Sequence, residues 1–383
     1  MSGPLKGVRV VELAGIGPAP FACMMLADMG ADVLRLDRLR TGPEDDWWLA
    51  EDILSRGRRS VEVDLKDPAG AELVAGLCET ADVLVEGFRP GVAERLGLGP
   101  EPLRARNPRL VYGRMTGWGQ DGPLADRAGH DINYTALTGA LHAIGPADGP
   151  PVPPLNLLGD FGGGGLLLAF GLVSGLFEAR RSGHGQVVDA AMIDGVSLLM
   201  AWPFTLRNAG RWNDARGSNL LDGGAPNYTA YETADGAHVA VGAMEPKFLL
   251  RLLSRLGLPA ELAGALDDPA EWPAVRDRIA GVFRTRTRAQ WEGFFAGDDV
   301  CATPVLSMGE AAGHPQLRAR EVLHPTAHGY QPAPAPRFSR TAPSAPGGPT
   351  LPGSGGAAAL ADWGVPESRV SGLRDRGVVR TRD

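Results

Sequence analysis

The segment VRVVELAGIGPAPFACMMLADMGADVLRL (residues 8–36) indicates the fold class. Its first six residues are a short apolar run that predicts a strand, and a turn rich in Gly and Pro follows. Residues 21–29 predict a helix that ends at Gly30, and residues 31–36 predict a second strand. A strand, a helix and another strand in this order begin a parallel sheet. We therefore expect an α/β protein with a Rossmann-like parallel sheet.

More strand-like runs follow at residues 60–65, 81–86, 109–115 and 187–192. The most apolar and Gly-rich run, residues 161–177, lies mid-chain, and we interpret it as a buried core helix rather than a membrane span. Arginines recur near the predicted strand ends, where open parallel sheets bind ligands and guanidinium groups suit phosphates. Solvated surface arginines are the alternative interpretation. These arginines are Arg38, Arg58, Arg59, Arg89 and Arg95.

A chain of 383 residues is long for a single core, so we expect two domains. The predicted parts are a large domain (1–205), a linker (206–227), a smaller α+β domain (228–330) and a return segment with a Pro/Gly-rich tail (331–383). The small domain begins with a predicted hairpin at 228–245 and an amphipathic helix at 248–258. We expect residues 343–356 to be poorly ordered. Residues 42–55 are either a Trp-bearing lid or a surface loop.

Charge and cysteine content exclude several classes of protein. The net charge of −7 argues against a general nucleic-acid binder. Three widely spaced cysteines provide neither a disulfide framework nor a metal-binding pair, which indicates a reducing compartment, and we expect the cytoplasm. No His/Cys cluster has metal-ligand spacing. The chain enters a predicted strand almost at once, so we expect no signal peptide, and we expect no membrane partner.

Candidate acid/base residues occur at three places in the chain. His130 and Asp131 are adjacent, Asp160 lies among glycines, and Glu245 ends an apolar run. Histidine is the side chain that titrates near neutral pH, and a buried carboxyl has a raised pKa that suits proton transfer. Two such groups that face one carbon could remove a proton and return it to the other side.

Ordinary structural roles are the alternatives at each place. A His-Asp pair is more often a capping or hydrogen-bonding pair, Gly159-Asp160 is more often a turn, and Glu245 before a proline suits a helix N-terminus. The sequence Gly15-x-Gly17 resembles the start of a dinucleotide fingerprint. Pro20 stands where the third glycine should be, which makes a nicotinamide oxidoreductase a weaker hypothesis.

Ordered motifs over about residues 3–340 resemble CoA-transferase family III and, within it, the α-methylacyl-CoA racemases. The motifs lie at 7–20, 30–33, 58–66, 86–91, 96–99, 115–120, 129–134, 153–164, 185–192, 222–226 and 241–245. The resemblance implies a large CoA-binding domain, a small domain and an interlocked homodimer. It also implies that His130 and Asp160 are the two acid/bases, that Glu245 partners His130, and that a main-chain N–H near Asp131 binds the thioester oxygen.

The resemblance further implies a set of residues that contact CoA. They are Arg38, Val63, Asp64, Leu65, Lys66, Gly87, Phe88, Arg89, Pro90, Gly91, Val92, Arg95, Gly129, His130, Asp131, Ile132, Asn133 and Tyr134.

The implied reaction is a 1,1-proton transfer that racemises a 2-methylacyl-CoA thioester through an enolate. It needs no metal or redox cofactor, because the thioester acidifies the α-carbon and CoA enters as part of the substrate. One alternative is a CoA transferase that uses Asp160 as its nucleophile. Another is an acyl-CoA-binding protein without catalytic activity.

Overall fold

The computed structural model describes residues 2–39 and 47–382, which form two compact units. The first contains Met1–Thr138, Leu155–Leu199 and Arg320–Asp383, and the second contains Gly139–Pro154 and Met200–Ala319. Residues 139–154, which we expected in the large domain, fall in the second unit. There the Arg216 guanidinium donates to the carbonyl oxygens of His142, Pro146 and Gly149.

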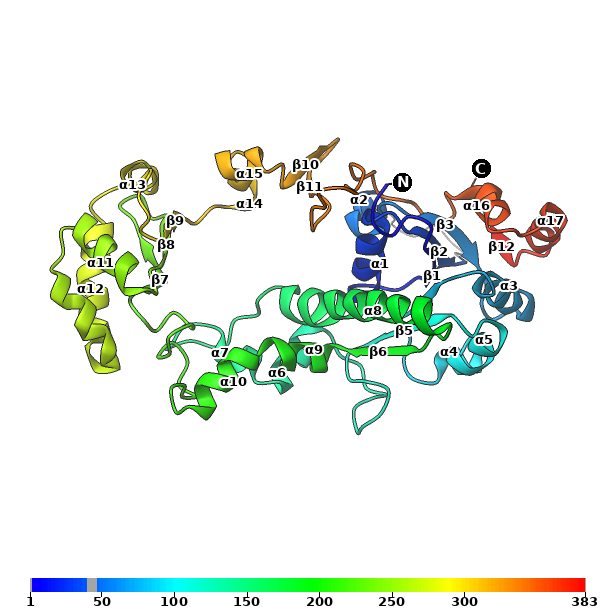
Figure 1. Cartoon of the computed structure of the whole chain (residues 1–383), viewed down its shortest axis with the longest axis horizontal. Helices are drawn as coiled ribbons and strands as arrows, with labels where there is room; N and C mark the ends of the chain where they lie inside the picture. The colour runs from blue at the N-terminus through cyan, green and yellow to red at the C-terminus, as the bar shows by residue number, and fades with distance from the viewer. Residues whose placement is uncertain (1, 40–46, 383) are drawn as a thin grey trace. The chain divides into compact units, whose positions relative to one another are not determined.

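A seven-stranded sheet forms the centre of the first unit (Figure 1), in the order β12-β3-β2-β1-β4-β5-β6. The order from β3 to β6 is that of a doubly wound dinucleotide fold. All neighbours pair in parallel except β12, which is antiparallel to β3. This confirms the predicted α/β class with a parallel sheet. The strands are β1 (Arg9–Leu13), β2 (Asp32–Arg38), β3 (Arg59–Val63), β4 (Val83–Glu86), β5 (Val111–Thr116), β6 (Val187–Ala191) and β12 (Val379–Arg380).

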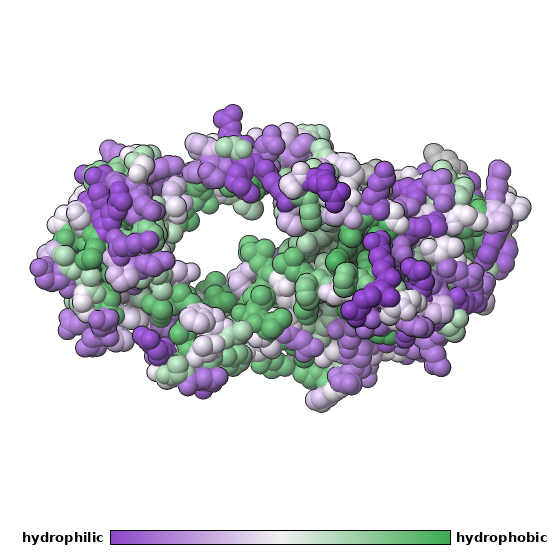
Figure 2. Space-filling model, viewed as in Figure 1, coloured by the Kyte–Doolittle hydropathy of each residue, from purple (hydrophilic) through white to green (hydrophobic). Residues whose placement is uncertain are grey.

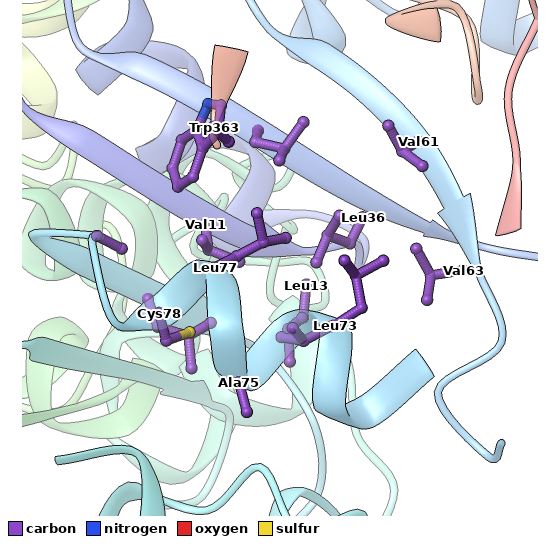
Figure 3. Packing of buried hydrophobic residues seen from close by; sticks show 14 of the residues in the cluster. Val11, Leu13, Leu36, Val61, Val63, Leu73, Ala75, Leu77, Cys78 and Trp363 are labelled. Carbon is purple, nitrogen blue, oxygen red and sulfur yellow. The ribbon is translucent and has the colours of Figure 1, made fainter. Parts of the chain in front are cut away.

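Helices cover both faces of this sheet and bury its apolar side chains. On one face α3 (Pro68–Cys78) packs with α5 (Pro100–Arg106), and Figure 3 shows Leu73 and Leu77 of α3 beside Leu13 and Leu36 of the strands. On the other face α1 (Pro18–Asp28) packs beside α8 (Leu167–Ser182). Strands buried on both faces explain the nearly continuous apolar runs in the sequence. Shorter helices of this unit are α2 (Trp47–Glu51), η1 (Ile53–Ser55), α4 (Val92–Arg95), α6 (Asp131–Leu137) and α9 (Met192–Leu199).

The C-terminal tail is part of the first unit's core. It forms α16 (Gly356–Asp362), α17 (Glu367–Asp375) and β12, and the Trp363 side chain is buried among the strands and α3. The expectation of poor order at 343–356 is wrong for the end of that stretch. The Thr350 N–H donates to Ser55 Oγ and the Gly353 N–H to Ser60 Oγ, so main-chain bonds fix a segment that composition alone suggests is loose.

Two of the arginines that we predicted near a ligand crevice instead have structural partners. The Arg58 guanidinium contacts Glu12 at 2.7 Å, and both side chains are fully buried. Arg59 pairs with Asp32 and Asp362. Both arginines lie where β3 begins, whereas ligands of such sheets bind beyond the carboxyl ends of the strands. The phosphate-binding interpretation is therefore wrong for Arg58 and Arg59.

Within the described residues, one helical stretch, Leu157–Ser182, is long and apolar enough to cross a membrane, and 39% of its most apolar window is buried. It comprises the π-helix η2 (Leu157–Leu166) and α8, which packs against β5 and β6. The prediction of a core helix holds for the side that carries Leu168 and Leu172, and is wrong for the opposite side, where Phe170 is 71% exposed. A helix that packs one apolar side into the core and exposes another explains both its high apolar content and its partial burial.

The second unit is a small α+β body. The antiparallel strands β7 (Tyr228–Glu232), β8 (His238–Gly242) and β9 (Ala302–Pro304) pack against helices around Phe283 and Trp291. This confirms the predicted hairpin, and α11 (Pro246–Arg255) is the predicted amphipathic helix. Residues 42–46 of the suggested lid lie outside the described residues.

The remaining elements include the core helices α12 and α13 of the second unit and several shorter pieces. In the second unit they are α7 (Ala140–Ala143), α10 (Ala201–Asn208), η3 (Ala260–Asp267), η4 (Pro269–Glu271), α12 (Trp272–Phe283), α13 (Arg288–Phe295), α14 (Met308–Ala311) and α15 (Pro315–Ala319). The hairpin of β10 (Leu323–Thr326) and β11 (Gly329–Pro332) belongs to the first unit.

The buried pair of Glu12 and Arg58 predicts a large loss of stability when one partner is neutralised. Glu12→Gln leaves the Arg58 charge buried without its counter-ion, so we expect the free energy of unfolding to fall by about 3–5 kcal/mol. Urea unfolding at pH 7 and one protein concentration measures this. Glu72→Gln, which breaks the exposed ion pair with Arg106, is the control and should cost less than about 1 kcal/mol. Equal losses in both variants would contradict the prediction.

Candidate active site

A cavity of about 660 Å³ opens at the carboxyl end of the parallel sheet. It is lined by the loops after β1, β4 and β5, by the start of α6 and by η2. The chain leaves β1 toward α1 on one face and leaves β4 toward α5 on the other. A doubly wound sheet binds its ligands at this kind of switch point. The position of the cavity therefore follows from the strand order.

His130 lines this cavity from the N-terminus of α6. It is exposed, and its main-chain N–H donates to Asn133 Oδ1 at 3.0 Å, which fixes the first turn of the helix. The turn before it is held by Tyr134, whose hydroxyl donates to the Gly129 carbonyl at 2.5 Å. The Trp118 ring packs edge-on against the Tyr134 ring, with 4.7 Å between the ring centroids. The histidine is thus carried by a turn that is fixed on both sides.

Asp160 lines the same cavity from η2 and is half-buried. Burial raises the pKa of its carboxyl above the ordinary aspartate value, and the Asp131 charge adds to this. The Asn156 amide, which donates to Asp160 Oδ2 at 3.3 Å, opposes the shift, as does the charge of His130. The cavity is therefore lined by the imidazole of His130 and by the Asp160 carboxyl, whose pKa is raised.

Close contacts to the main chain of η2 explain its glycines. A Cβ on Gly195 of α9 would overlap the carbonyl oxygen of Gly163, and one on Gly165 would lie 2.6 Å from the Phe21 ring of α1. A Cβ on Gly159 would lie 2.5 Å from Asp131 Oδ2. The helix is wound as a π-helix, a form that occurs often at functional sites. Glycines let three neighbours approach the segment that carries Asp160.

Asp131 is buried and has a structural role, as the alternative interpretation of the His-Asp pair suggested. Its Oδ2 accepts the N–H groups of Gly159 at 2.7 Å and of Asp160 at 2.8 Å. The carboxylate thus joins the first turn of α6 to the first turn of η2.

The structure gathers part of the predicted CoA-binding set around this cavity. Residues 87–90, Gly129, His130 and Tyr134 line it. Leu65, Lys66 and Arg95 line a second cavity of about 340 Å³ beside α3. The other predicted residues lie outside both linings, and their contacts with CoA stay predictions.

These other residues differ in exposure. Arg38 is exposed at the end of β2, whereas the Val63 side chain is buried in the core. The Asp64 carboxylate accepts the Lys66 N–H at 2.9 Å. Gly91 precedes α4 and Val92 begins it, while Ile132 and Asn133 are exposed on α6.

Glu245 belongs to the second unit. It is the exposed N-cap residue of α11, in agreement with the interpretation of this acid as a helix N-terminus. Its pairing with His130 stays a prediction.

Several cavity residues were absent from the predicted site. Ile16 follows β1 and Trp118 follows β5, while Arg127 and Asn156 shortly precede His130 and Asp160 in the chain. The signal for Ile16 and Trp118 was their place directly after predicted strands of one parallel sheet. Arg127 and Asn156 lie in turns, whose path the residue pattern does not reveal.

No group of three or more His, Cys, Asp or Glu side chains in the described part of the chain could hold a metal ion. The model of the family described as CoA-transferase family III matches residues 5–355. The chain belongs to CoA-transferase family III.

Similar proteins include both racemases and transferases. The chain is 45% identical to alpha-methylacyl-CoA racemase of Mus musculus over 98% of each chain. It is 44% identical to the racemase of Homo sapiens over 88% of this chain and 87% of the relative. It is 30% identical to succinyl-CoA:glutarate CoA-transferase of Mus musculus over 88% and 81%. The resemblance seen in the sequence is therefore confirmed.

Among solved structures, a CAIB/BAIF family protein from Brucella suis matches with a TM-score of 0.78 and 27% identity. The match covers 95% of this chain and 100% of that one. The large domain with a parallel sheet is therefore shared with that family.

The surroundings of Asp160 predict how its pKa responds to substitution. NMR titration of the carboxyl carbon should give a midpoint above the ordinary aspartate value, and Asn156→Ala should raise it further because a donor to the carboxylate is lost. Since the folded pKa is raised, the free energy of unfolding should fall as the pH rises from the unfolded to the folded pKa. Asp160→Asn should remove this fall. A downward shift in Asn156→Ala would contradict the prediction.

Proposed function

We propose that this protein is an isomerase that racemises 2-methylacyl-CoA thioesters by 1,1-proton transfer. The observation that supports this most is the presence of His130 and Asp160 on one cavity at the switch point of the sheet. Identity of 44–45% to racemases over most of the chain supports the choice of substrate.

The proposed reaction needs two acid/base groups on opposite sides of one carbon, and we assign these roles to Asp160 and His130. In one direction the Asp160 carboxylate takes the α-proton, and the electron pair of the broken C–H bond moves onto the thioester oxygen. The main-chain N–H of Asp131 stabilises this enolate oxygen. The His130 imidazolium then returns a proton to the opposite side of the α-carbon. The reverse direction begins with neutral His130 and protonated Asp160.

CoA is part of the substrate, and the proposed reaction uses no metal or redox cofactor. Arg89 lines the cavity and is exposed, and Lys66 and Arg95 line the second cavity. These cations suit the phosphates of CoA. Binding energy from the distant nucleotide would help to position the acyl group over the acid/base pair.

Transfer of CoA between carboxylic acids is the second candidate, because transferases share the family. The Asp160 carboxylate, accessible from the cavity, could attack a thioester and form an acyl anhydride with release of the CoA thiolate. His130 favours the racemase, since a transferase needs no acid/base group opposite this aspartate.

We also propose that the protein works as a homodimer. The outer side of α8 carries exposed Phe170, Val173 and Phe177, and Leu198 and Leu199 of α9 are exposed as well. Figure 2 shows hydrophobic residues on the surface in the region of η2 and α8. Apolar patches of this kind are typical of protein interfaces.

The cytoplasm remains our proposal for the compartment, supported by three free thiols, of which Cys23 and Cys78 are buried. The expectation that the protein binds neither nucleic acid nor membranes also stays a prediction.

Proton NMR of a 2-methylacyl-CoA in D2O tests the proposed reaction. We expect the wild-type protein to exchange the α-proton and to interconvert both epimers without any acceptor acid. His130→Ala and Asp160→Asn should each lower the rate of epimerisation by about 10²- to 10⁴-fold, because each removes one acid/base group.

The same experiment separates the two candidate functions. Absence of exchange, together with movement of CoA to an added carboxylic acid and trapping of Asp160 by hydroxylamine, would establish the transferase instead. Full epimerisation by His130→Ala would contradict the two-base mechanism.

Charges on the outer side of α8 should disrupt the proposed dimer. We expect Phe170→Asp combined with Phe177→Asp to halve the mass measured by sedimentation, from twice 40.2 kDa to that of one chain. Met308→Asp, at a residue that is 94% exposed in the second unit, is the control and should leave the mass unchanged. A monomeric wild-type protein would contradict the proposal.

A further inference from the structure

We propose that the carboxylate of Asp131 is a positioning residue for the reaction, which holds Asp160 at the distance and angle that proton transfer requires. The inference rests on the proposed function, because it assigns a role to the surroundings of its second acid/base group. It concerns the Asp131 side chain, whereas the proposed function uses only the main-chain N–H of this residue.

The hydrogen bonds of the Asp131 side chain reach the main chain of Asp160 itself. One oxygen, Oδ2, accepts both the Gly159 N–H at 2.7 Å and the Asp160 N–H at 2.8 Å. A bond to the residue's own N–H limits how its Cα, and therefore its carboxyl, can move. Bonds between a charged acceptor and N–H donors are stronger than those between neutral groups.

The helix η2 cannot satisfy these two N–H groups itself. Its first bond of the π type joins the Phe161 N–H to the Asn156 carbonyl, so the N–H groups of Gly159 and Asp160 precede the bonded ladder. Burial of unpaired N–H groups is costly, and Asp131 is the acceptor that they have. Without it the first turn of η2, which carries Asp160, would lack an anchor.

The fit around Asp131 is tight. The residue is 8% exposed, and a Cβ on Gly159 would lie 2.5 Å from its Oδ2. Its other oxygen, Oδ1, is buried and has no hydrogen-bond partner among the described residues. The carboxylate therefore fits one arrangement, in which a single oxygen serves η2.

The same residue connects both acid/base groups. Asp131 follows His130 directly in the chain, at the start of α6, and its side chain holds the main chain of Asp160. A shift of η2 relative to α6 would change the spacing of the two groups. Misplacement of a reacting group by about 1 Å costs about 10²-fold in rate.

Substitutions of Asp131 separate positioning from simple support of the fold. Asp131→Ala removes the acceptor. Asp131→Asn keeps an oxygen that can accept both N–H groups. We expect the alanine variant to lower kcat for epimerisation by about 10²-fold with KM changed less than about threefold. The asparagine variant should recover most of this loss.

Exchange in D2O provides a readout that a loss of folding would not produce. In Asp131→Ala, His130 keeps its own anchor to Asn133. We therefore expect exchange of the α-proton to continue from the side that faces His130, while inversion slows by about 10²-fold. General unfolding would lower exchange and inversion together. The control variant is Asp126→Ala, at an exposed residue of the preceding loop, and it should exchange and invert at the wild-type rates.

The outcomes distinguish the inference from the proposed function. A wild-type protein that neither exchanges nor inverts would overturn the proposed function. A wild-type protein that inverts, with an alanine variant that inverts equally well, would overturn only the role of Asp131. An alanine variant that loses exchange and inversion in parallel, without rescue by asparagine, would also overturn it.

Discussion

The main chain of η2 approaches its neighbours more closely than any side chain would allow. Gly163 meets Gly195 of α9, Gly165 meets Phe21 of α1, and Gly159 meets the carboxylate of Asp131. These three contacts fix the segment that carries Asp160 against both the core and α6. Because close-packed interiors are hard to compress, these contacts restrict movement of the main chain at Asp160. The precision of the site thus comes from residues that have no side chain.

The strand order of the sheet determines where the cavity lies. Loops after β1 and β4 diverge to opposite faces of the sheet, and the cavity lies at this switch point. His130 and Asp160 reach this crevice from α6 and η2, elements that are not strands of the sheet. The sheet and its loops therefore form a pocket, and separate helices carry the two groups that we propose to react. This separation explains how one fold can serve different reactions of CoA thioesters.

The sequence predicted the sheet well because buried parallel strands are nearly continuous apolar runs. The motifs placed His130 and Asp160 in one candidate site, and both line the same cavity. The sequence could not reveal that Asp131 bonds to the main chain 28 residues later. Arg58 was interpreted as either a phosphate-binding or a solvated surface arginine, and it is instead buried against Glu12. The pattern of residues does not show which end of a strand faces the crevice. The prediction of poor order in the C-terminal tail was wrong for a related reason. Its Pro/Gly-rich composition suggested poor order, yet its main-chain bonds to Ser55 and Ser60 depend on the folded core.

Charge is used in two distinct ways in the first unit. Glu12 and Arg58 are fully buried as a pair, so each offsets part of the other's cost of burial, and neither is accessible to a ligand. Arg89 and Arg127 at the cavity are exposed and have no ion pair with any described residue. Asp160 is intermediate between the fully buried ion pair and the exposed arginines. Burial raises the pKa of its carboxyl, and the hydrogen bond from the Asn156 amide limits this rise. A carboxyl whose pKa is raised in this way suits the proton-transfer role that we propose for Asp160.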